Sequence, residues 1–447
     1  MKLLLIEPLN RLATERRKMS FLQKIPLNTY FNMPALALGV LAALTPDDWE
    51  VKIIQEPADE IVYDQDVDLV GISAATHTAK RGYEIADEFR KRGKKVILGG
   101  IHPTVMTEEA LQHCDSVCIG EAETVWKTIL EDTKTNKLAR TYRPENHFDL
   151  KDYAAPKRQL LPDHKSLFYK TKTLEASRGC PYDCDFCSVS LIHGRKIRYR
   201  PLENLVPEIE SLENKNLFFV DNNIISNTKR AKELFREITP LKKRWTGQST
   251  ISIAKDRELL KLASVSGCYG LLIGIESLSK EGFNKYQKNP HNLNELREVL
   301  RIIKDNGIGV LAHMVFGDDF ETKETIQESI ENLMELDVVS ATLGILVPYP
   351  GTKLAARLEE QNRILTKDWN YYDIHHLVYQ PANFSCHEFL EKVTDIRKQF
   401  FSAKNILSRT FRYGTPGALG YNINSCSHNR VNHNLDMVEL HNGKDLN

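Results

Sequence analysis

The sequence lacks both an excess of one charge and a long apolar run. Lys and Arg together number 60, as do Asp and Glu, so the chain has no net charge and no overall attraction to a polyanion. The longest apolar stretch, residues 33–44, is too short to cross a bilayer and predicts a buried helix. The apolar run at the start breaks at Glu7, before it reaches the length of a signal-peptide core. We therefore expect a soluble protein without a nucleic-acid partner.

Cysteine is also sparse, and its eight residues are unevenly placed. Cys180, Cys184 and Cys187 stand in the spacing C-x3-C-x2-C, whereas the others are scattered along the chain. This spacing argues against a disulfide framework. It allows one short loop to place three thiolates on a [4Fe–4S] cluster and to leave the fourth iron open. Because such a cluster is sensitive to oxygen, we expect the reducing cytoplasm.

Zinc is the alternative occupant of this loop. A structural zinc site would need a fourth Cys or His at short spacing, and none follows Cys187 before His193. A coincidence of core cysteines is the other alternative. The context of the motif within the fold decides between them.

Residues 1–134 predict an α/β domain. Apolar runs alternate there with helical patterns, and the runs cover residues 2–6, 50–54, 67–73, 95–99 and 116–119. Strands in this order form a doubly wound parallel sheet of the Rossmann type, which binds ligands at the carboxyl ends of its strands. Small residues in the loops 71–76, 99–104 and 120–123 leave room for a large flat ligand near the backbone.

A second α/β region follows a linker. Residues 135–170 are polar, contain several prolines and show no periodicity, which predicts a linker. Between residues 171 and 352, apolar runs again alternate with helical patterns, at 171–176, 217–221, 244–250, 270–276, 309–316 and 341–347. Six β/α units are fewer than the eight of a closed TIM barrel, so we predict a partial (β/α)6 barrel. The cysteine loop follows its first strand, at the mouth where barrel active sites lie.

The C-terminal part is predicted to be a helical cap over 353–425 and disordered over 426–447. A helical run from 387 to about 407 is followed by a mixture of aromatic and basic residues, 409–413. Such a mixture can lie on a membrane surface. The alternative is a packing face whose cations reach past the apolar surface into water. The last residues are polar and rich in Asn and His, which predicts disorder.

Polar residues near the carboxyl ends of the barrel strands are candidate ligands for a cofactor or substrate. Asp221 ends the second predicted strand, Gln248 lies on the third, and Glu276 ends the fourth. His313 interrupts the apolar run of the fifth strand, where an inward imidazole could donate or accept a proton. Tyr349 lies in a turn after the sixth strand. The alternative for each is an ordinary polar residue whose hydrogen bonds are satisfied within the fold.

Cys180, Cys184, Phe186 and Cys187 match the C-x3-C-x-aromatic-C signature of radical S-adenosylmethionine (SAM) enzymes. The chain therefore resembles that superfamily. The resemblance implies that SAM chelates the open iron. It also implies that SAM is contacted by residues around the cluster and at the barrel strand ends, namely Phe186, Asp221, Gln248 and Glu276.

The loops of the first domain resemble the cobalamin-binding domain found at the N-terminus of many radical SAM enzymes. The sequence Gly-Gly-Ile-His-Pro-Thr at residues 99–104 is the closest match. The resemblance implies that cobalamin is contacted by residues of these loops, namely Ser73, Thr76, Gly99, Gly100, Ile101, His102, Thr104, Gly120 and Glu121.

One departure from this family's pattern concerns the cobalt. Residues 7–11, Glu-Pro-Leu-Asn-Arg, stand where related domains have the Asp-x-His-x-x-Gly motif that supplies a histidine ligand. We therefore expect bound cobalamin to lack such a ligand. His102 as a cobalt ligand is an alternative, although a loop histidine more often makes ordinary hydrogen bonds. A flavodoxin-like module that binds a nucleotide, or nothing, is the alternative for the whole domain.

The order of cobalamin-like domain, linker, radical SAM core and C-terminal cap covers nearly the whole chain. It resembles the class B cobalamin-dependent radical SAM proteins, which include hopanoid methylases, anaerobic chlorophyll ring cyclases and enzymes that modify archaeal lipids. The resemblance implies hydrogen abstraction from an unactivated carbon and methylation of that carbon, on a hydrophobic small molecule or a lipid. It also implies an electron donor such as a flavodoxin or a ferredoxin.

Three alternative functions are open to the same sequence. The first is radical cyclisation or another C–C bond formation without methyl transfer. The second, a tRNA methylthiotransferase-like modifier, needs a second cluster and a basic RNA-binding domain, which the scattered cysteines and the balanced charge do not supply. The third is a non-catalytic iron–sulfur module, against which the complete set of β/α units argues.

Overall fold

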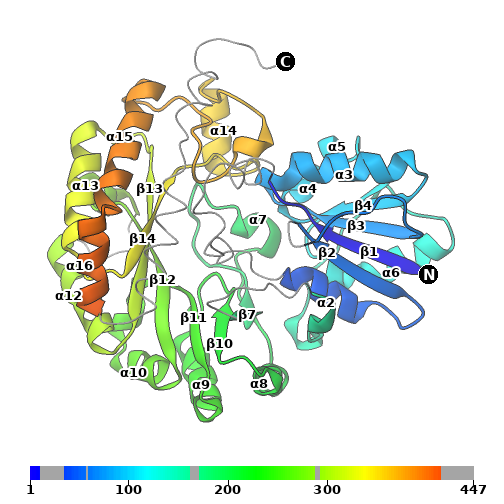
Figure 1. Ribbon diagram of the computed structural model, residues 1–447, viewed down its shortest axis with the longest axis horizontal. Coiled ribbons are helices and arrows are strands. Elements are labelled where there is room, and N and C mark those ends of the chain that lie inside the picture. The colour runs from blue at the N-terminus through cyan, green and yellow to red at the C-terminus, as the bar shows by residue number, and fades with distance from the viewer. Residues whose placement is uncertain (11–34, 57–58, 162–170, 287–291, 414–447) are drawn as a thin grey trace. The chain divides into compact units, whose positions relative to one another are not determined.

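The computed structural model describes residues 1–10, 35–56, 59–161, 171–286 and 292–413 (Figure 1). The chain divides into two compact units. The first comprises Met1–Glu208, Pro348–Glu360 and Lys367–Asp373, and the second comprises Ile209–Val347, Gln361–Thr366 and Ile374–Asn447. Each unit contains parallel strands that alternate with helices, so the predicted α/β fold class is confirmed.

The first unit contains a parallel sheet with the strand order β2-β1-β3-β4-β5-β6. In chain order its strands are Lys2–Glu7, Glu50–Gln55, Leu69–Ser73, Lys95–Gly99, Ser116–Cys118 and Thr141–Tyr142. The first five are the predicted strands. The two-residue β6 was not predicted and lies in the segment expected to be a linker, where Thr141 pairs with Val117 of β5. The strand order reverses between β1 and β3, which is the ligand-binding position in sheets of this kind.

Helices cover both faces of this sheet (Figure 1). One face carries α2 (Leu36–Leu44) and α6 (Trp126–Lys134), and alternate residues of β1 pack against them in one core cluster. The predicted buried helix over 33–44 is therefore present as α2, although its first two residues lie outside the described part of the chain. The other face carries α3 (Ala79–Lys91), α4 (Ile101–Val105) and α5 (Thr107–Ala110). Two 3-10 turns, η3 (Thr76–Thr78) and η4 (Ala122–Thr124), precede α3 and α6.

The same unit contains the cysteine loop. Strand β8 (Ser177–Arg178) pairs with β9 (Arg198–Tyr199) in antiparallel register, and α7 (Val189–His193) lies between them in the chain. The loop is thus closed at its base by a two-stranded ladder. The other elements nearby in sequence are η5 (Leu150–Asp152), η6 (Arg158–Leu160), β7 (Thr171–Leu174) and α8 (Leu202–Ser211). Later in the chain, α14 (Lys353–Glu360) and η9 (Trp369–Tyr371) return to this unit.

The second unit is built on the parallel strands β10 to β14, in the spatial order β14-β13-β12-β11-β10. They span Asn216–Phe219, Arg244–Ser249, Cys268–Glu276, Gly309–Phe316 and Ser340–Ile345. Together with β7 they account for all six strands predicted for the barrel. The intervening helices are α9 (Thr228–Ile238), η7 (Thr239–Leu241), η8 (Ile251–Lys255), α10 (Arg257–Val265), α11 (Lys280–Tyr286), α12 (Leu293–Asp305) and α13 (Lys323–Glu335).

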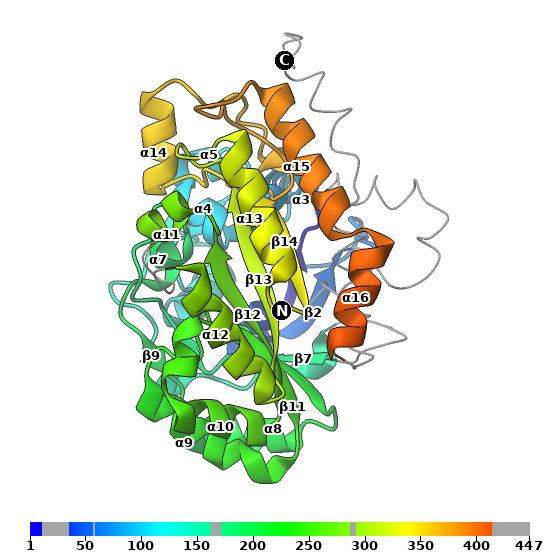
Figure 2. The same cartoon turned by 90° about the vertical axis from the view of Figure 1, so that its left-hand side faces the viewer.

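The C-terminal helical run is two helices, α15 (Cys386–Phe400) and α16 (Ala403–Tyr413), where one was predicted. Figure 2 shows α13 and α15 side by side along the outside of this unit. Arg397 of α15 is buried, and its guanidinium donates to the carbonyl oxygen of Leu343 at 3.1 and 2.8 Å. This cation therefore serves packing. Within the described residues, no helix is both long and apolar enough to cross a membrane. The tail predicted to be disordered lies outside them.

Candidate cofactor sites

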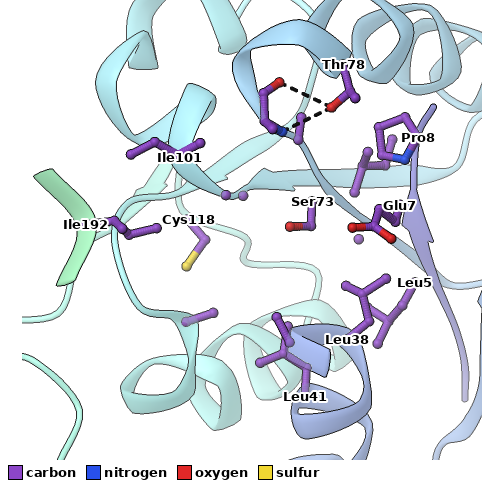
Figure 3. A pocket seen from close by; sticks show the side chains of 18 of the residues that line it. Leu5, Glu7, Pro8, Leu38, Leu41, Ser73, Thr78, Ile101, Cys118 and Ile192 are labelled. Atoms are coloured by element: carbon purple, nitrogen blue, oxygen red, sulfur yellow. Dashed lines mark hydrogen bonds between the residues drawn. The ribbon is translucent and has the colours of Figure 1, made fainter. Parts of the chain in front are cut away.

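A cavity of about 600 Å³ lies at the carboxyl ends of β1, β3, β4 and β5 in the first unit. Of the residues predicted to contact cobalamin, those that line it are Ser73, Gly99, Gly100, Ile101, Gly120 and Glu121. Figure 3 shows the side chains of Glu7, Ser73 and Cys118 pointing into the cavity, with Leu38 and Leu41 of α2 opposite them. An aliphatic wall on one side and a glycine-edged rim on the other fit a large flat molecule with polar arms. The chemistry of this lining thus fits the corrin ring of cobalamin.

Gly100 shapes the rim of this cavity through its backbone. Its φ of 96° lies in the left-handed region, and a Cβ there would lie 2.6 Å from the carbonyl oxygen of Ala74. The two loops are joined by hydrogen bonds from Ala74 N to Gly99 O at 2.9 Å and from His102 N to Ala74 O at 3.2 Å. Gly99 is different, because a Cβ there would meet nothing closer than Cys118, at 3.8 Å. Gly99 therefore leaves space for a ligand, and Gly100 allows the backbones of the two loops to approach closely.

Three of the predicted cobalamin contacts lie outside the cavity wall, where the structure gives them supporting positions. Thr104 donates to Gly100 O at 2.8 Å and accepts from Gly120 N at 2.9 Å, so it ties two rim glycines together. Thr76 is buried in the turn before α3. His102 is fully buried, with Nε2 3.3 Å from Glu109 and its ring 5.0 Å from that of Trp369.

Glu7 and His77 also line the cavity, and sequence reasoning did not select either as a site residue. Glu7 ends β1, and burial raises the pKa of its carboxyl to about 7 against an opposing hydrogen bond from Gln55. Burial lowers the pKa of His77, although Asp373 opposes the shift, so the imidazole is neutral at physiological pH. A carboxylate at the end of the first strand of a doubly wound sheet was the available signal for Glu7.

The cysteine loop presents three thiols on one short hairpin. Cys180, Cys184 and Cys187 are each partly exposed, and Cys187 N donates to Cys184 O at 3.2 Å in a tight turn. In the described part of the chain, no three His, Cys, Asp or Glu side chains converge as a preformed metal site. Ligand loops commonly converge only when the metal binds. Three thiols at this spacing, without a fourth nearby ligand, fit a cluster with one open iron.

One segment of the first unit, Pro348–Glu360, braces this loop. Lys353 of α14 pairs with Asp183 at 2.7 Å, and Leu354 N donates to the carbonyl oxygen of Asp185 at 2.9 Å. Tyr349, in the turn before α14, has its pKa raised by burial and by the neighbouring charges of Asp373 and Cys187. Its phenol therefore remains protonated beside the cluster loop.

The SAM candidates of the second unit lie on or after neighbouring strands. Asp221 is buried two residues beyond β10, Gln248 lies in β11, and Glu276 is the last residue of β12. Glu276 has a φ of 66°, an uncommon conformation for a residue with a side chain, and the pairing register shifts there. Strain of this kind concentrates at functional positions. His313 lies in β13, and burial lowers its pKa to about 4, so it is a neutral imidazole.

Comparison with known proteins identifies the families of both regions. Residues 174–333 match the radical SAM superfamily, and residues 25–130 match the B12 binding domain. The chain is 31% identical over 401 residues to the bacteriochlorophyllide d C-8(2)-methyltransferase of Chlorobaculum tepidum, covering 84% of this chain and 87% of that protein. It is 26% identical to the anaerobic magnesium-protoporphyrin IX monomethyl ester cyclase of Cereibacter sphaeroides. This match covers 77% of this chain and 61% of the cyclase.

A solved structure supports the fold. The cobalamin-dependent radical SAM enzyme OxsB, with aqua-cobalamin and SAM bound, superposes with a TM-score of 0.68 at 14% identity, covering 97% of this chain and 71% of that one. The chain belongs to the radical SAM enzymes that carry a B12-binding domain. The cofactors of this enzyme are accordingly a [4Fe–4S] cluster, SAM and cobalamin.

The partly buried Glu7 generates a prediction about pH. Its pKa lies at about 7 in the folded protein, compared with 4.5 for an ordinary glutamate. The contribution of protonated Glu7 to stability is therefore full below pH 4.5 and is lost as the pH rises through 7. The free energy of unfolding of Glu7→Gln should rise relative to wild type by about 2 kcal/mol between pH 5 and pH 8.

Urea unfolding of the cofactor-free protein at both pH values measures this difference. Glu321, whose pKa burial raises to about 8, titrates in both proteins and cancels in the comparison. Parallel pH profiles for the two proteins would contradict the assignment.

The two rim glycines should respond differently to substitution. Gly100→Ala should lower the free energy of unfolding by about 2–4 kcal/mol, because the new Cβ meets the Ala74 backbone in a left-handed conformation. Gly99→Val should cost under about 1 kcal/mol but weaken aquacobalamin binding at least about tenfold by filling the cavity. Urea unfolding and visible absorbance titration measure the two effects. Wild-type affinity in Gly99→Val would argue against this cavity as the cobalamin site.

Proposed function

We propose that this enzyme transfers a methyl group to an unactivated carbon of a hydrophobic small molecule, with a tetrapyrrole as the first substrate to test. The observation that carries the proposal is the similarity to a bacteriochlorophyllide methyltransferase along 84% of this chain, through both the cobalamin and the radical SAM regions. A lipid substrate is the second choice, since the same enzymes act on apolar carbons that lack an activating group.

Different residues of the chain are assigned to the cluster, to SAM, to cobalamin and to the substrate. We assign Cys180, Cys184 and Cys187 to the cluster, and Phe186, Asp221, Gln248 and Glu276 to SAM. When bound, the cluster supplies the electron that cleaves SAM, and cobalamin carries the methyl group. The glycine rim of the cavity admits the corrin ring, and the aliphatic side chains opposite exclude water from it. Neutral His313 and protonated Tyr349 are the candidate groups for substrate binding or proton transfer.

Radical ring closure without methyl transfer is the second candidate function. The similarity to an anaerobic magnesium-protoporphyrin cyclase supports it, at a lower identity and coverage than the similarity to the methyltransferase. Both candidates use the same cofactors and both act on tetrapyrroles in the relatives. They differ in how SAM is consumed.

The consumption of SAM therefore tests the function. A methyltransferase uses one SAM to methylate cobalamin and another to form the radical. Reduced enzyme with SAM, cobalamin and bacteriochlorophyllide d should yield S-adenosylhomocysteine and 5′-deoxyadenosine in near-equal amounts, with methylated product. Liquid chromatography with mass spectrometry quantifies all three, and replacing the three cluster cysteines with Ala should abolish 5′-deoxyadenosine. Product formed with 5′-deoxyadenosine but without S-adenosylhomocysteine would contradict methyl transfer and support radical cyclisation as the function.

We further propose that the enzyme is cytoplasmic and receives its electron from a flavodoxin or a ferredoxin. We also propose that it contacts a membrane through α16. Two large apolar side chains of that helix are one turn apart and exposed, Leu407 at 51% and Phe411 at 80%. Arg412 follows Phe411, is 35% exposed and pairs with Asp337 at 3.7 Å. An apolar surface with a cation at its edge suits an anionic bilayer that also holds an apolar substrate.

Flotation with phosphatidylglycerol-containing liposomes tests the membrane contact. The wild-type protein should float with the liposomes, and Leu407→Ser together with Phe411→Ser should lower the bound fraction at least about threefold by removing the apolar contact. Exposed apolar Val62, in the first unit, offers a matched control as Val62→Ser. Equal flotation of wild type and the double variant would exclude this surface.

A further inference from the structure

Glu121 is a buried carboxylate at the junction of the two cofactor sites of the first unit. It follows β5, lines the cobalamin cavity, and has a side chain that is only 2% exposed. Arg198 donates to both of its oxygens, at 2.7 and 2.8 Å, in a bidentate pair. His193 Nδ1 lies at 3.1 Å, Phe148 N donates at 2.8 Å, and Arg178 lies at 3.4 Å.

The partners of Glu121 flank the cysteine loop on both sides. Arg178 belongs to β8, two residues before Cys180, and His193 and Arg198 follow the loop in α7 and β9. Arg178 and Arg198 stand opposite each other in the β8–β9 ladder. One carboxylate therefore holds both ends of the loop that binds the cluster.

The same residues form part of the cobalamin cavity wall. Arg178 and His193 line it from the cluster side, and residues 120–123 line it from the sheet side. Glu121 therefore links the 120–123 loop by direct contacts to the base of the cysteine loop. A chain of packed, hydrogen-bonded groups is a physical route by which two sites can be coupled.

The charges at this junction are strong and permanent. Burial by itself would raise the pKa of Glu121, but hydrogen bonds from His193 and Arg198 and the charges of Arg178 and Arg198 hold that pKa well below its usual range. Arg178 also pairs with Glu123 at 2.6 Å and with Glu175 at 2.9 Å. Bidentate pairs of buried charges fix geometry more firmly than neutral contacts do.

We propose that Glu121 is a positioning residue that couples the two cofactor sites, holding the cysteine loop against the cobalamin cavity so that each cofactor strengthens the binding of the other. This inference rests on the use of both cofactors in the proposed function, and not on the choice between methylation and cyclisation. Coupling between two binding sites is reciprocal, so it can be measured from either side.

The experiment compares cobalamin affinity with and without the cluster. Aquacobalamin is titrated by visible absorbance into anaerobically reconstituted protein and into the variant in which Cys180, Cys184 and Cys187 are all Ala. In the wild-type background the cluster should tighten binding about fivefold or more. In the Glu121→Gln background the ratio of the two dissociation constants should fall below about two, since the amide cannot hold both guanidinium groups. An undiminished ratio in Glu121→Gln, or no coupling in the wild type, would overturn the proposal.

Glu56→Gln is the matched control. Glu56 lines the same cavity and forms a bidentate pair with Arg81 of α3, inside the same sheet domain, at 2.7 and 3.2 Å. Its substitution removes a comparable carboxylate but should leave the ratio at the wild-type value, whatever it does to cobalamin affinity itself. A loss of coupling in Glu56→Gln equal to that in Glu121→Gln would show a general effect of cavity charge and overturn the specific role.

Two variants of Arg198 and a spectroscopic measurement distinguish a loss of coupling from misfolding. Arg198→Lys retains the charge and should keep part of the coupling, whereas Arg198→Met should lose it. With excess dithionite to keep the cluster reduced and the cobalamin as cob(II)alamin, the electron paramagnetic resonance signal of the cluster should change on addition of cobalamin in the wild type and not in Glu121→Gln or Arg198→Met. A cobalamin-dependent change retained in both variants would overturn the proposal. Methylated product formed by a protein without such coupling would refute this inference and leave the proposed function intact.

Discussion

Parallel pairing of the strands in the sheet β2-β1-β3-β4-β5-β6 places every following loop at the same edge. The loops after β1, β3, β4 and β5 therefore meet, and small residues within them leave a cavity where larger side chains would close it. The antiparallel β8–β9 ladder then brings the two ends of the cysteine loop to one wall of that cavity. The cavity and the support of the cysteine loop thus depend on the same edge of one sheet.

Two carboxylates in this wall have opposite electrostatic environments. Burial raises the pKa of Glu7 to about 7, so that a neutral carboxylic acid able to donate a hydrogen bond is well populated at neutral pH. Glu121 is more deeply buried but meets two guanidinium groups, and its charge is retained. The cavity is therefore titratable near the end of β1 and permanently charged where it adjoins the cysteine loop. Burial without a cation, as at Glu7, leaves a carboxyl group able to change its protonation state beside a ligand. Pairing with cations, as at Glu121, keeps the carboxylate charged and gives it a structural role.

The residues of the Gly-Gly-Ile-His-Pro-Thr segment, 99–104, lie partly in the cavity wall and partly behind it. Its glycines and Ile101 line the cavity, whereas His102 and Thr104 lie behind the wall and fix the backbone of the rim. A motif of this kind specifies the shape of a site as much as its contacts. In the second unit, Glu276 shows the same principle, because its left-handed backbone at the end of β12 sets where its carboxylate lies.

Sequence alone was enough to recognise the class of protein and the longer strands of both units, although it missed the two-residue strands β6, β8 and β9. The three cysteines remain its prediction for the cluster ligands. Periodicity and spacing are local, so the runs at β1 and β13 and the cysteines 180, 184 and 187 could be recognised from neighbours along the chain. Which loop residues face the cavity and which lie behind them became visible in the folded chain alone. Glu7, His77 and the Glu121 network depend on side chains brought together from distant segments, such as residues 121 and 198. Burial and charge pairing arise from that assembly, and no local pattern encodes them.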